Sequence, residues 1–433
     1  MTAPLSSLLR HTPGCPSFPP LVAKTPLAPF SHSLGGNMKR ILTLALASLF
    51  AMALAQPVTI GLMSPLTGGA AGTGQAQKAG FELALAEINA AGGVLGAPLE
   101  VILEDTQANA EVALAAFEKL MTEDGVSFIA GGYSSGATLG LIQSFKTFQP
   151  VIAWIGGAVS GVGIDGFDGI EELLAEDPWF FHVHPWDYQN VEAATNFVSG
   201  SGVNSVALLH EDSAFGGPGA AGAQGLLEAA GLTVPIREAF TSTLLGGSGD
   251  FRPAISKAQA TDADMLYWIG YDSDVVPLIG QVRELGYVPN QIFGAPPGWP
   301  SEFAAAPEAQ CVTGLIGFLP NLPNPEARTF TDAYTALHGS EPDNYMAALA
   351  YATLWMYADA INAAGTADEE AVMEQMRSMT FGSPMGDWSF GQSELTSQQG
   401  FGADMWLVFQ YQDGVREIVY PLSKATAPLA TCR

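Results

Sequence analysis

A short segment rich in glycine and hydroxyl side chains is the clearest candidate for chemistry in this sequence. Residues 131–138 read GGYSSGAT, directly after an apolar run and directly before a segment with helical spacing. Free backbone N–H groups and the positive end of a helix dipole would lie at that helix start, beside Ser134 and Ser135. The segment therefore predicts a carboxylate-binding site, although serine at such a turn often serves only as a helix N-cap.

The same segment also fits a hydrolase motif. Residues 132–136 match G-x-S-x-G, the nucleophile turn of α/β-hydrolases, with Ser134 as the nucleophile. Such an enzyme needs an acid and then a histidine later in the chain. His338 ends a helical segment beside a glycine, and the other histidines after residue 55 come early: His182, His184 and His210. A secreted serine hydrolase using Ser134 is the alternative, and binding without catalysis or cofactor is the main interpretation.

Two further patterns carry weaker signals. Residues 217–222 read GPGAAG, formally G-x-G-x-x-G, but residues 210–216 separate them from the preceding predicted strand, so we interpret them as a loop leading into a helix. His182, His184, His210 and Asp187 could suggest a metal, because residues two apart on a strand face the same side. No cysteine or glutamate at ligand spacing completes the set, so we expect no metal site.

Strand and helix patterns alternate along the chain after residue 57. An apolar run from Val58 meets a Gly/Pro/Thr loop, followed by an amphipathic segment at 81–89. Further strands are predicted at 99–103, 126–130, 151–155, 180–184, 206–209, 232–235, 265–269 and 291–293. Helices are predicted at 138–148, 251–260, 275–285, 325–338 and 344–364, and a hairpin at 405–411 and 416–420. This alternation predicts an α/β protein with doubly wound parallel sheets, and the 48% hydrophobic content supports two cores.

The opening strand–loop–helix unit, residues 58–93, closely resembles the start of the type I periplasmic solute-binding proteins, the leucine/isoleucine/valine-binding family of ABC importers. The resemblance runs from about Val58 to Tyr420. It implies two doubly wound parallel-sheet lobes and a hinge that the chain crosses three times, near 182–185, 314–317 and 381–384. The N-terminal lobe is then 56–181 plus 316–382, and the C-terminal lobe is 182–315 plus 383–433.

The resemblance also implies a ligand site. Ser135 falls where the family has its carboxylate-binding serine, and Phe215 and Tyr271 match cleft positions. The family's Ala-Thr pair is Ala158-Val159 here, with Ser160 next, so one hydroxyl is lost or displaced and the backbone of Ala158 remains. The full set of expected ligand residues is Thr73, Ser134, Ser135, Ala158, Ser160, Phe215, Tyr271 and Asp272.

One departure from the family bears on the identity of the solute. The family's acid for a ligand ammonium lies in the loop that corresponds to 294–298, which reads GAPPG here and contains no carboxylate. A buried ammonium without a partner is costly. Either an aspartate takes this role, with Asp272 the first choice and Asp187 or Asp274 next, or the solute has no ammonium. We expect an amino-acid-like, amide or carboxylate solute.

The N-terminal region predicts export. Residues 1–37 are proline-rich and lack acids, as expected of a misassigned start, whereas 38–55 combine a basic start, an apolar run and the small-x-small end Ala53-Leu54-Ala55. We interpret 38–55 as a cleaved signal peptide, which gives a periplasmic or extracytoplasmic chain from Gln56. In that oxidising compartment Cys311 and Cys432 are expected to form a disulfide.

The strong negative charge narrows the partners. The chain has 43 acidic and 16 basic residues and a formal net charge of −27. Such a surface repels phosphate backbones and anionic lipids, which argues against nucleic-acid binding and membrane attachment. We expect a monomer that passes a small-molecule solute to an ABC permease and does not insert into the membrane after processing.

Overall fold

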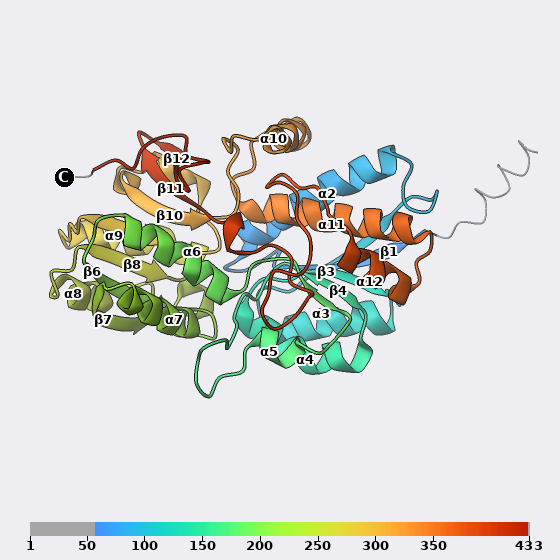
Figure 1. Ribbon diagram of the computed structural model, residues 1–433, viewed down its shortest axis with the longest axis horizontal. Helices are drawn as coiled ribbons and strands as arrows, with labels where there is room; N and C mark the ends of the chain where they lie inside the picture. The colour runs from blue at the N-terminus through green and yellow to red at the C-terminus, as the bar shows by residue number, and fades with distance from the viewer. Residues whose placement is uncertain (1–56, 432–433) are drawn as a thin grey trace, which may run out of the picture. The chain divides into compact units, whose positions relative to one another are not determined.

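Two β-sheets organise the computed structural model, which describes residues 57–431 (Figure 1). The first sheet has the order β2-β1-β3-β4-β5, and all its strands run parallel. Its strands are β1 (Thr59–Ser64), β2 (Glu100–Asp105), β3 (Phe128–Gly131), β4 (Val151–Trp154) and β5 (Phe180–His182). Parallel strands place all their carboxyl ends at one edge, where α/β proteins bind ligands.

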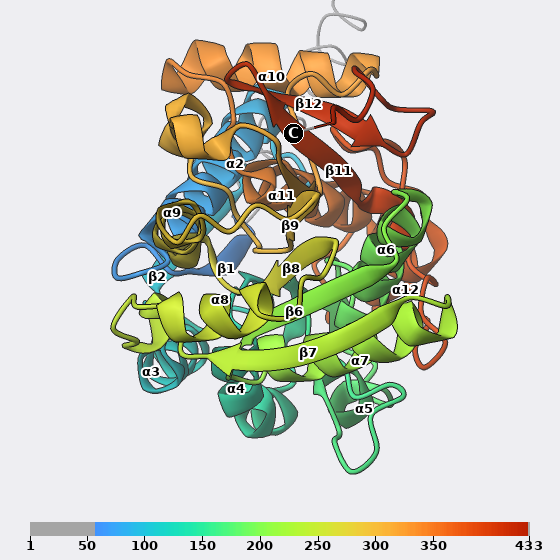
Figure 2. The ribbon, with the colours of Figure 1, turned by 90° about the vertical axis from the view of Figure 1, so that its left-hand side faces the viewer.

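The second sheet is larger and mixed. Its order is β12-β11-β10-β9-β8-β6-β7, with β11 and β12 antiparallel to their neighbours and the other pairs parallel. Its strands are β6 (Ser205–Glu211), β7 (Thr233–Phe240), β8 (Met265–Ile269), β9 (Gln291–Gly294), β10 (Val312–Ile316), β11 (Leu407–Gln412) and β12 (Val415–Tyr420). Figure 2 faces this sheet, with edge strand β7 toward the viewer.

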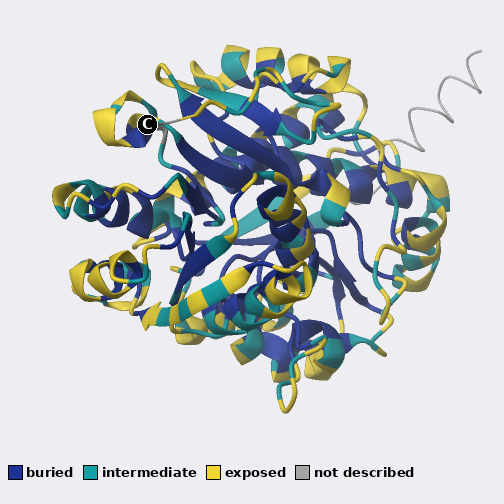
Figure 3. Cartoon of the chain, turned by 60° about the vertical axis from the view of Figure 1, so that its left-hand side comes forward, coloured by how far each residue is buried: buried dark blue, intermediate teal, exposed yellow. Residues whose placement is uncertain are grey.

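Helices cover both faces of the sheets. They are α2 (Ala71–Ala90), α3 (Ala110–Thr122), α4 (Ser135–Phe148), α5 (Ile170–Leu174), α6 (Asp187–Gly200), α7 (Gly216–Ala229), α8 (Arg252–Gln259), α9 (Val275–Glu284), α10 (Pro325–His338), α11 (Tyr345–Ala364) and α12 (Glu369–Ser378). In β4, Val151 and Ala153 join the core under α2 and α11, whereas Ile152 and Trp154 join the core under α3 and α4. Because successive strand residues point to opposite faces, a strand covered on both sides is apolar throughout, as β4 is. Figure 3 shows buried strands, in dark blue, in the interior.

The chain passes between the sheets three times. It leaves the first sheet after β5, builds β6 to β10, and then returns to form α10, α11 and α12, of which α11 packs along α2. After α12 it goes back to add β11 and β12 to the second sheet. The predicted fold class, two doubly wound sheets joined by a three-crossing hinge, is confirmed. The sequence boundaries of the two lobes stay a prediction.

Several local predictions need correction. Residues 217–222, interpreted as a loop, lie inside α7, where glycines and alanines pack close to α6. The sequence pattern does not predict the strand β10, whose short apolar run is interrupted by Gly314. A Cβ there would lie 2.2 Å from the Trp299 ring, so the glycine serves packing rather than a bend. The hairpin about residues 413 and 414 is confirmed.

The predictions for the chain ends fall mostly outside the residues that the structure describes. The leader 1–37, the signal peptide 38–55 and Gln56 lie outside the described residues, as does Cys432. Cys311 is disulfide-bonded, and its pairing with Cys432 stays a prediction. Within residues 57–431, no helix is both long and apolar enough to cross a membrane.

The close approach of α2 and α11 gives a direct test of the packing. A Cβ at Gly80 would lie 2.0 Å from the Ala347 carbonyl oxygen, whereas one at Gly72, in the same helix, meets nothing within 4 Å. Gly80→Ala should lower the free energy of unfolding by about 1–3 kcal/mol through overpacking. Gly72→Ala should be neutral or stabilise by at most about 1 kcal/mol. Urea unfolding measures both, and equal effects would contradict this packing.

Candidate functional site

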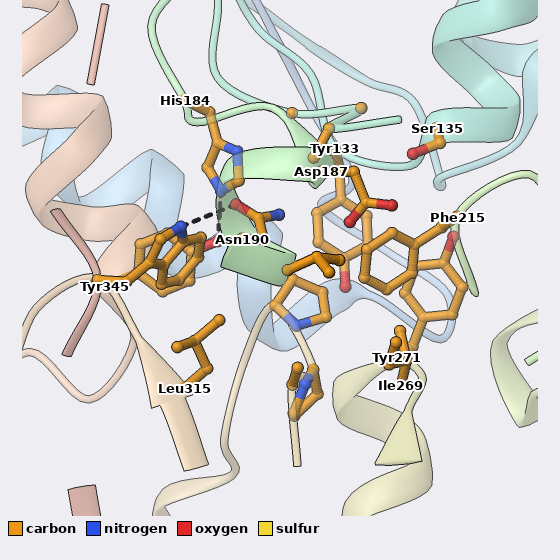
Figure 4. Close-up of a pocket in the computed structure, with 18 of the residues that line it drawn as sticks. Tyr133, Ser135, His184, Asp187, Asn190, Phe215, Ile269, Tyr271, Leu315 and Tyr345 are labelled. Atoms are coloured by element: carbon orange, nitrogen blue, oxygen red, sulfur yellow. Dashed lines mark hydrogen bonds between the residues drawn. The ribbon is translucent and has the colours of Figure 1, made fainter. Parts of the chain in front are cut away.

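A buried cavity lies where loops from both sheets meet. The first sheet contributes the loops after β3 and β4, with Tyr133, Ser135 and Ala158 in the wall, and the second contributes the loops after β6, β8 and β9. Residues at the start of α6 and α11 complete the enclosure (Figure 4). The free volume is about 40 Å³. Since one water needs roughly 10–15 Å³ by this measure, the cavity as it stands holds only a few waters.

The start of α4 forms the end of the cavity suited to an anion. Gly131 and Gly132 have φ values of +114° and +95°, and a Cβ on Gly132 would lie 2.2 Å from the Trp154 ring. This glycine turn delivers Ser134 as N-cap, its Oγ accepting from the Ala137 N–H at 3.2 Å, and Ser135 as the first helical residue. Ser135 is buried and lines the cavity (Figure 4). A helix N-terminus with a hydroxyl beside it favours a carboxylate.

A buried carboxylate faces the middle of the same cavity. Asp187 begins α6 and is 5% exposed, and its backbone N–H donates to the Ala158 carbonyl at 2.6 Å. Burial raises the pKa of the Asp187 carboxyl to about 7, and the negative charge of the nearby Glu211 adds to the rise. A hydrogen bond from Asn190 lowers this pKa but does not cancel the effect of burial. No lysine or arginine lines the cavity in the described chain. The carboxyl group therefore has a donor but no opposite charge.

The far end of the cavity is aromatic. The His184 Nδ1 lies 2.7 Å from the Pro185 carbonyl, which can only accept, so Nδ1 carries the proton and Nε2 accepts from the Tyr345 hydroxyl at 2.8 Å. Burial lowers the pKa of His184 to about 3, so the ring is neutral. The Trp406 Nε1 donates to the Asn190 Oδ1 at 2.8 Å. Because these polar atoms bond one another, a solute meets mainly ring faces and aliphatic groups there.

Comparison with known proteins decides the family. A family model described as "Periplasmic binding protein" matches residues 57–414, which is most of the chain. This chain belongs to the periplasmic binding protein family. Within it, the chain is a type I member of the leucine/isoleucine/valine-binding group, the solute-binding proteins of ABC transporters, which are binding proteins rather than enzymes.

The relatives cover most of the length of this periplasmic binding protein. It is 26% identical over 338 residues to the leucine-, isoleucine-, valine-, threonine- and alanine-binding protein of Pseudomonas aeruginosa, covering 78% of this chain and 86% of the relative. A branched-chain amino acid transporter protein of Streptococcus pneumoniae in complex with isoleucine matches with a TM-score of 0.70 and 24% identity, covering 84% and 100% of the two chains. A solute-binding protein of R. palustris in complex with benzoate matches with a TM-score of 0.72 and 16% identity, covering 87% and 98%.

The binding protein's cavity includes half of the residues expected from the sequence. Ser135, Ala158, Phe215 and Tyr271 line it. The other four are not among its lining residues: Thr73, Ser134, Ser160 and Asp272. Local hydrogen bonds explain two of these. The Ser134 Oγ donates to the Ala108 carbonyl at 3.3 Å, and the Ser160 Oγ lies 3.2 Å from carboxylate oxygens of Glu171 and Glu172.

The first choice for an ammonium partner needs correction. Asp272 is buried, but its two oxygens accept from the Thr73 Oγ1 at 2.8 Å and the Tyr133 hydroxyl at 2.9 Å. Asp274 is bonded to the Ser242 hydroxyl and to the Tyr271 backbone N–H. Neither carboxylate lines the cavity, whereas Asp187 does.

The hydrogen bonds of the described residues do not support the serine hydrolase or the metal site that the motifs suggested. In the described chain, the hydrogen bonds of the Ser134 hydroxyl go to backbone groups, and none joins it to a histidine. His182, which the hydrolase and metal interpretations would need free, bonds Gln399 and the Gly156 carbonyl. Residues 57–431 contain no cluster of three or more His, Cys, Asp or Glu placed to hold a metal ion.

Sequence reasoning missed the far wall. Asn190, Tyr345, Met346 and Trp406 lie in or beside helices whose apolar spacing resembles that of any core helix. Leu315 belongs to β10, a strand that the sequence pattern does not predict. Only the fold brings these residues opposite Ser135.

The raised pKa of Asp187 predicts that the free energy of unfolding of the solute-free protein depends on pH. An acid whose pKa rises from 3.8 to about 7 on folding binds more protons in the folded state between these values, so stability falls as pH rises from about 4 to about 7. Asp187→Asn should remove this contribution. The stability of wild type relative to Asp187→Asn, measured by urea unfolding, should therefore fall from pH 4 to pH 7 and then level off. A constant difference would refute the assignment.

Proposed function

We propose that this periplasmic binding protein captures an α-amino acid with an apolar side chain and delivers it to the permease of an ABC importer. The observation that carries the proposal is that Asp187 and Ser135 line one cavity. An α-amino acid has a carboxylate and an ammonium on the same carbon. The start of α4 suits the first group, and the buried Asp187 carboxyl, which has no cationic side chain in the wall, suits the second.

Other solute classes fit less well. A simple or aromatic carboxylic acid would bring a second negative charge toward Asp187 in a site of low dielectric, where unpaired charges are costly. An amide or urea-like solute could donate to Asp187 but would leave the start of α4 without an anion. Relatives named or solved with branched-chain amino acids support the amino acid, while the relative with benzoate keeps an aromatic acid as the second candidate.

The rest of the cavity indicates the kind of side chain. Leu315 and Tyr345 lie at the end opposite Ser135 (Figure 4), and the Trp406 ring is 5.5 Å from the Tyr345 ring. Met346 also lines the cavity, and the polar atoms of Tyr345 and Trp406 already have partners. Burial of apolar surface against these groups drives binding of an aliphatic or aromatic side chain. A charged side chain would find no opposite charge at that end.

Binding requires the walls to part and close. The free volume of about 40 Å³ is too small for an amino acid, so the solute enters when the lobes separate at the three hinge crossings. The lobes that move are those defined by 56–181 plus 316–382 and by 182–315 plus 383–433. Closure around the solute excludes water and presents a shape to the permease.

The setting of this activity is extracytoplasmic. The chain is exported through the signal peptide 38–55, acts as a monomer from Gln56, and neither binds nucleic acid nor inserts into the membrane. The negative charge of the full chain, −27, disfavours binding to phosphate backbones and to anionic lipids.

Two variants test the amino-acid proposal by calorimetric titration. L-Leucine should bind wild type at least ten times more tightly than 4-methylpentanoate, which lacks the ammonium. Asp187→Asn should weaken L-leucine binding about ten- to a hundredfold, the equivalent of roughly 1.5–3 kcal/mol, and leave 4-methylpentanoate unchanged or tighter.

Ser135→Ala should weaken both solutes, because both have the carboxylate. Ser134→Ala is the matched control, since it removes a neighbouring hydroxyl that does not line the cavity. Binding of L-leucine that survives Asp187→Asn would contradict the proposal, as would tighter binding of benzoate than of L-leucine to wild type.

A further inference from the structure

The buried Asp272 joins elements of the two sheets outside the cavity wall. It follows β8 of the second sheet, and its carboxylate oxygens accept from the Thr73 Oγ1 at 2.8 Å and the Tyr133 hydroxyl at 2.9 Å. Thr73 belongs to α2 and Tyr133 to the loop after β3, so both donors come from the first sheet's side. Thr73 is 0% exposed and Tyr133 is 6% exposed.

These contacts extend into a small network. The Asn344 Nδ2, at the start of α11, donates to the Thr73 Oγ1 at 3.0 Å. The Thr73 hydroxyl therefore accepts a hydrogen bond from Asn344 and donates one to Asp272, so that it has a partner in both roles. The ring of Tyr133 lines the cavity, and its centre lies 6.0 Å from the centre of the Tyr271 ring. Tyr271 directly precedes Asp272 in the chain. Tyr133 thus connects the network to the cavity wall, whereas Asp272, Thr73 and Asn344 are not among the lining residues.

We propose that Asp272 is a positioning residue for solute binding: it latches the closed arrangement through Thr73 and Tyr133 and so sets affinity without touching the solute. A carboxylate accepting two hydroxyl hydrogen bonds makes the stronger, charge-assisted kind. When the lobes separate at the hinge, both bonds must break. The apparent affinity for any solute that binds the closed form then scales with the population of that form.

Loss of a latch residue and loss of a ligand contact should affect binding kinetics differently. The latch proposal rests on the proposed closure but not on the identity of the solute. Loss of the latch should raise the dissociation rate of every solute by one common factor, whereas loss of an ammonium partner affects only solutes with an ammonium. The association rate should barely change, since the open form lacks the bonds in either case.

The test measures closure directly in the solute-free protein. Fluorophores placed through Glu118→Cys in α3 and Glu228→Cys in α7, both exposed, report the closed fraction by single-molecule energy transfer. Asp272→Ala and Thr73→Val should each lower the closed fraction about tenfold, as expected for loss of a charge-assisted bond. Thr73→Ser, which keeps the hydroxyl, should behave like wild type, and Glu302→Ala controls for removal of an exposed acid.

A second measurement uses L-leucine in stopped flow. Asp272→Ala and Thr73→Val should raise its dissociation rate about tenfold, and the double variant should add little to either single change. An unchanged closed fraction in Asp272→Ala would overturn the latch. Failure of wild type to bind L-leucine would instead count against the amino-acid proposal, and the energy-transfer result would still decide the latch. Should Asp272→Ala not fold, Thr73→Val against Thr73→Ser decides it.

Discussion

The burial of the Asp187 carboxyl group is the constraint on which the account of this protein depends. Taking an ionised carboxylate out of water is costly unless an opposite charge or enough donors meet it. Asp187 has a hydrogen bond from Asn190 but no cation in the cavity wall, and its pKa rises to about 7 as a result. In the proposed function, a solute ammonium supplies the positive charge that the cavity wall lacks. Asp187 would then serve ligand binding at a cost to the stability of the solute-free protein.

The scaffold determines where that group and its counterpart lie. The glycine turn before α4 lets Ser135 reach the cavity, because a side chain at Gly132 would collide with Trp154. The first hinge crossing runs from β5 into α6 and places Asp187 directly after it. Rigid elements thus position both the proposed carboxylate site at the start of α4 and the Asp187 carboxyl group at the start of α6. In the proposed closure, the aromatic groups of the second sheet move onto the solute, and the bonds of Asp272 to Thr73 and Tyr133 form only when the two sides meet.

Much of this could be predicted from the sequence, and the limits have physical reasons. Local patterns give strands and helices, and the bounds of β8 and α10 match their predictions. Ser135 was predictable because a glycine-rich turn and a helix start are adjacent in sequence. The choice between Asp187 and Asp272 was not, because both are aspartates at the starts of helical segments and only tertiary contacts separate them. The Asp272 carboxylate accepts hydrogen bonds from the hydroxyls of Thr73 and Tyr133, which lie 199 and 139 residues away in sequence.

Proton release on binding tests the central claim most directly. If a ligand ammonium ionises Asp187, a carboxyl group with a pKa of about 7 must lose its proton when L-leucine binds below that pH. Titration calorimetry at pH 6, in buffers of different ionisation enthalpy, should show release of about one proton per L-leucine bound, falling toward none by about pH 8. The release should vanish in Asp187→Asn. Binding of L-leucine at pH 6 without proton release would contradict the account.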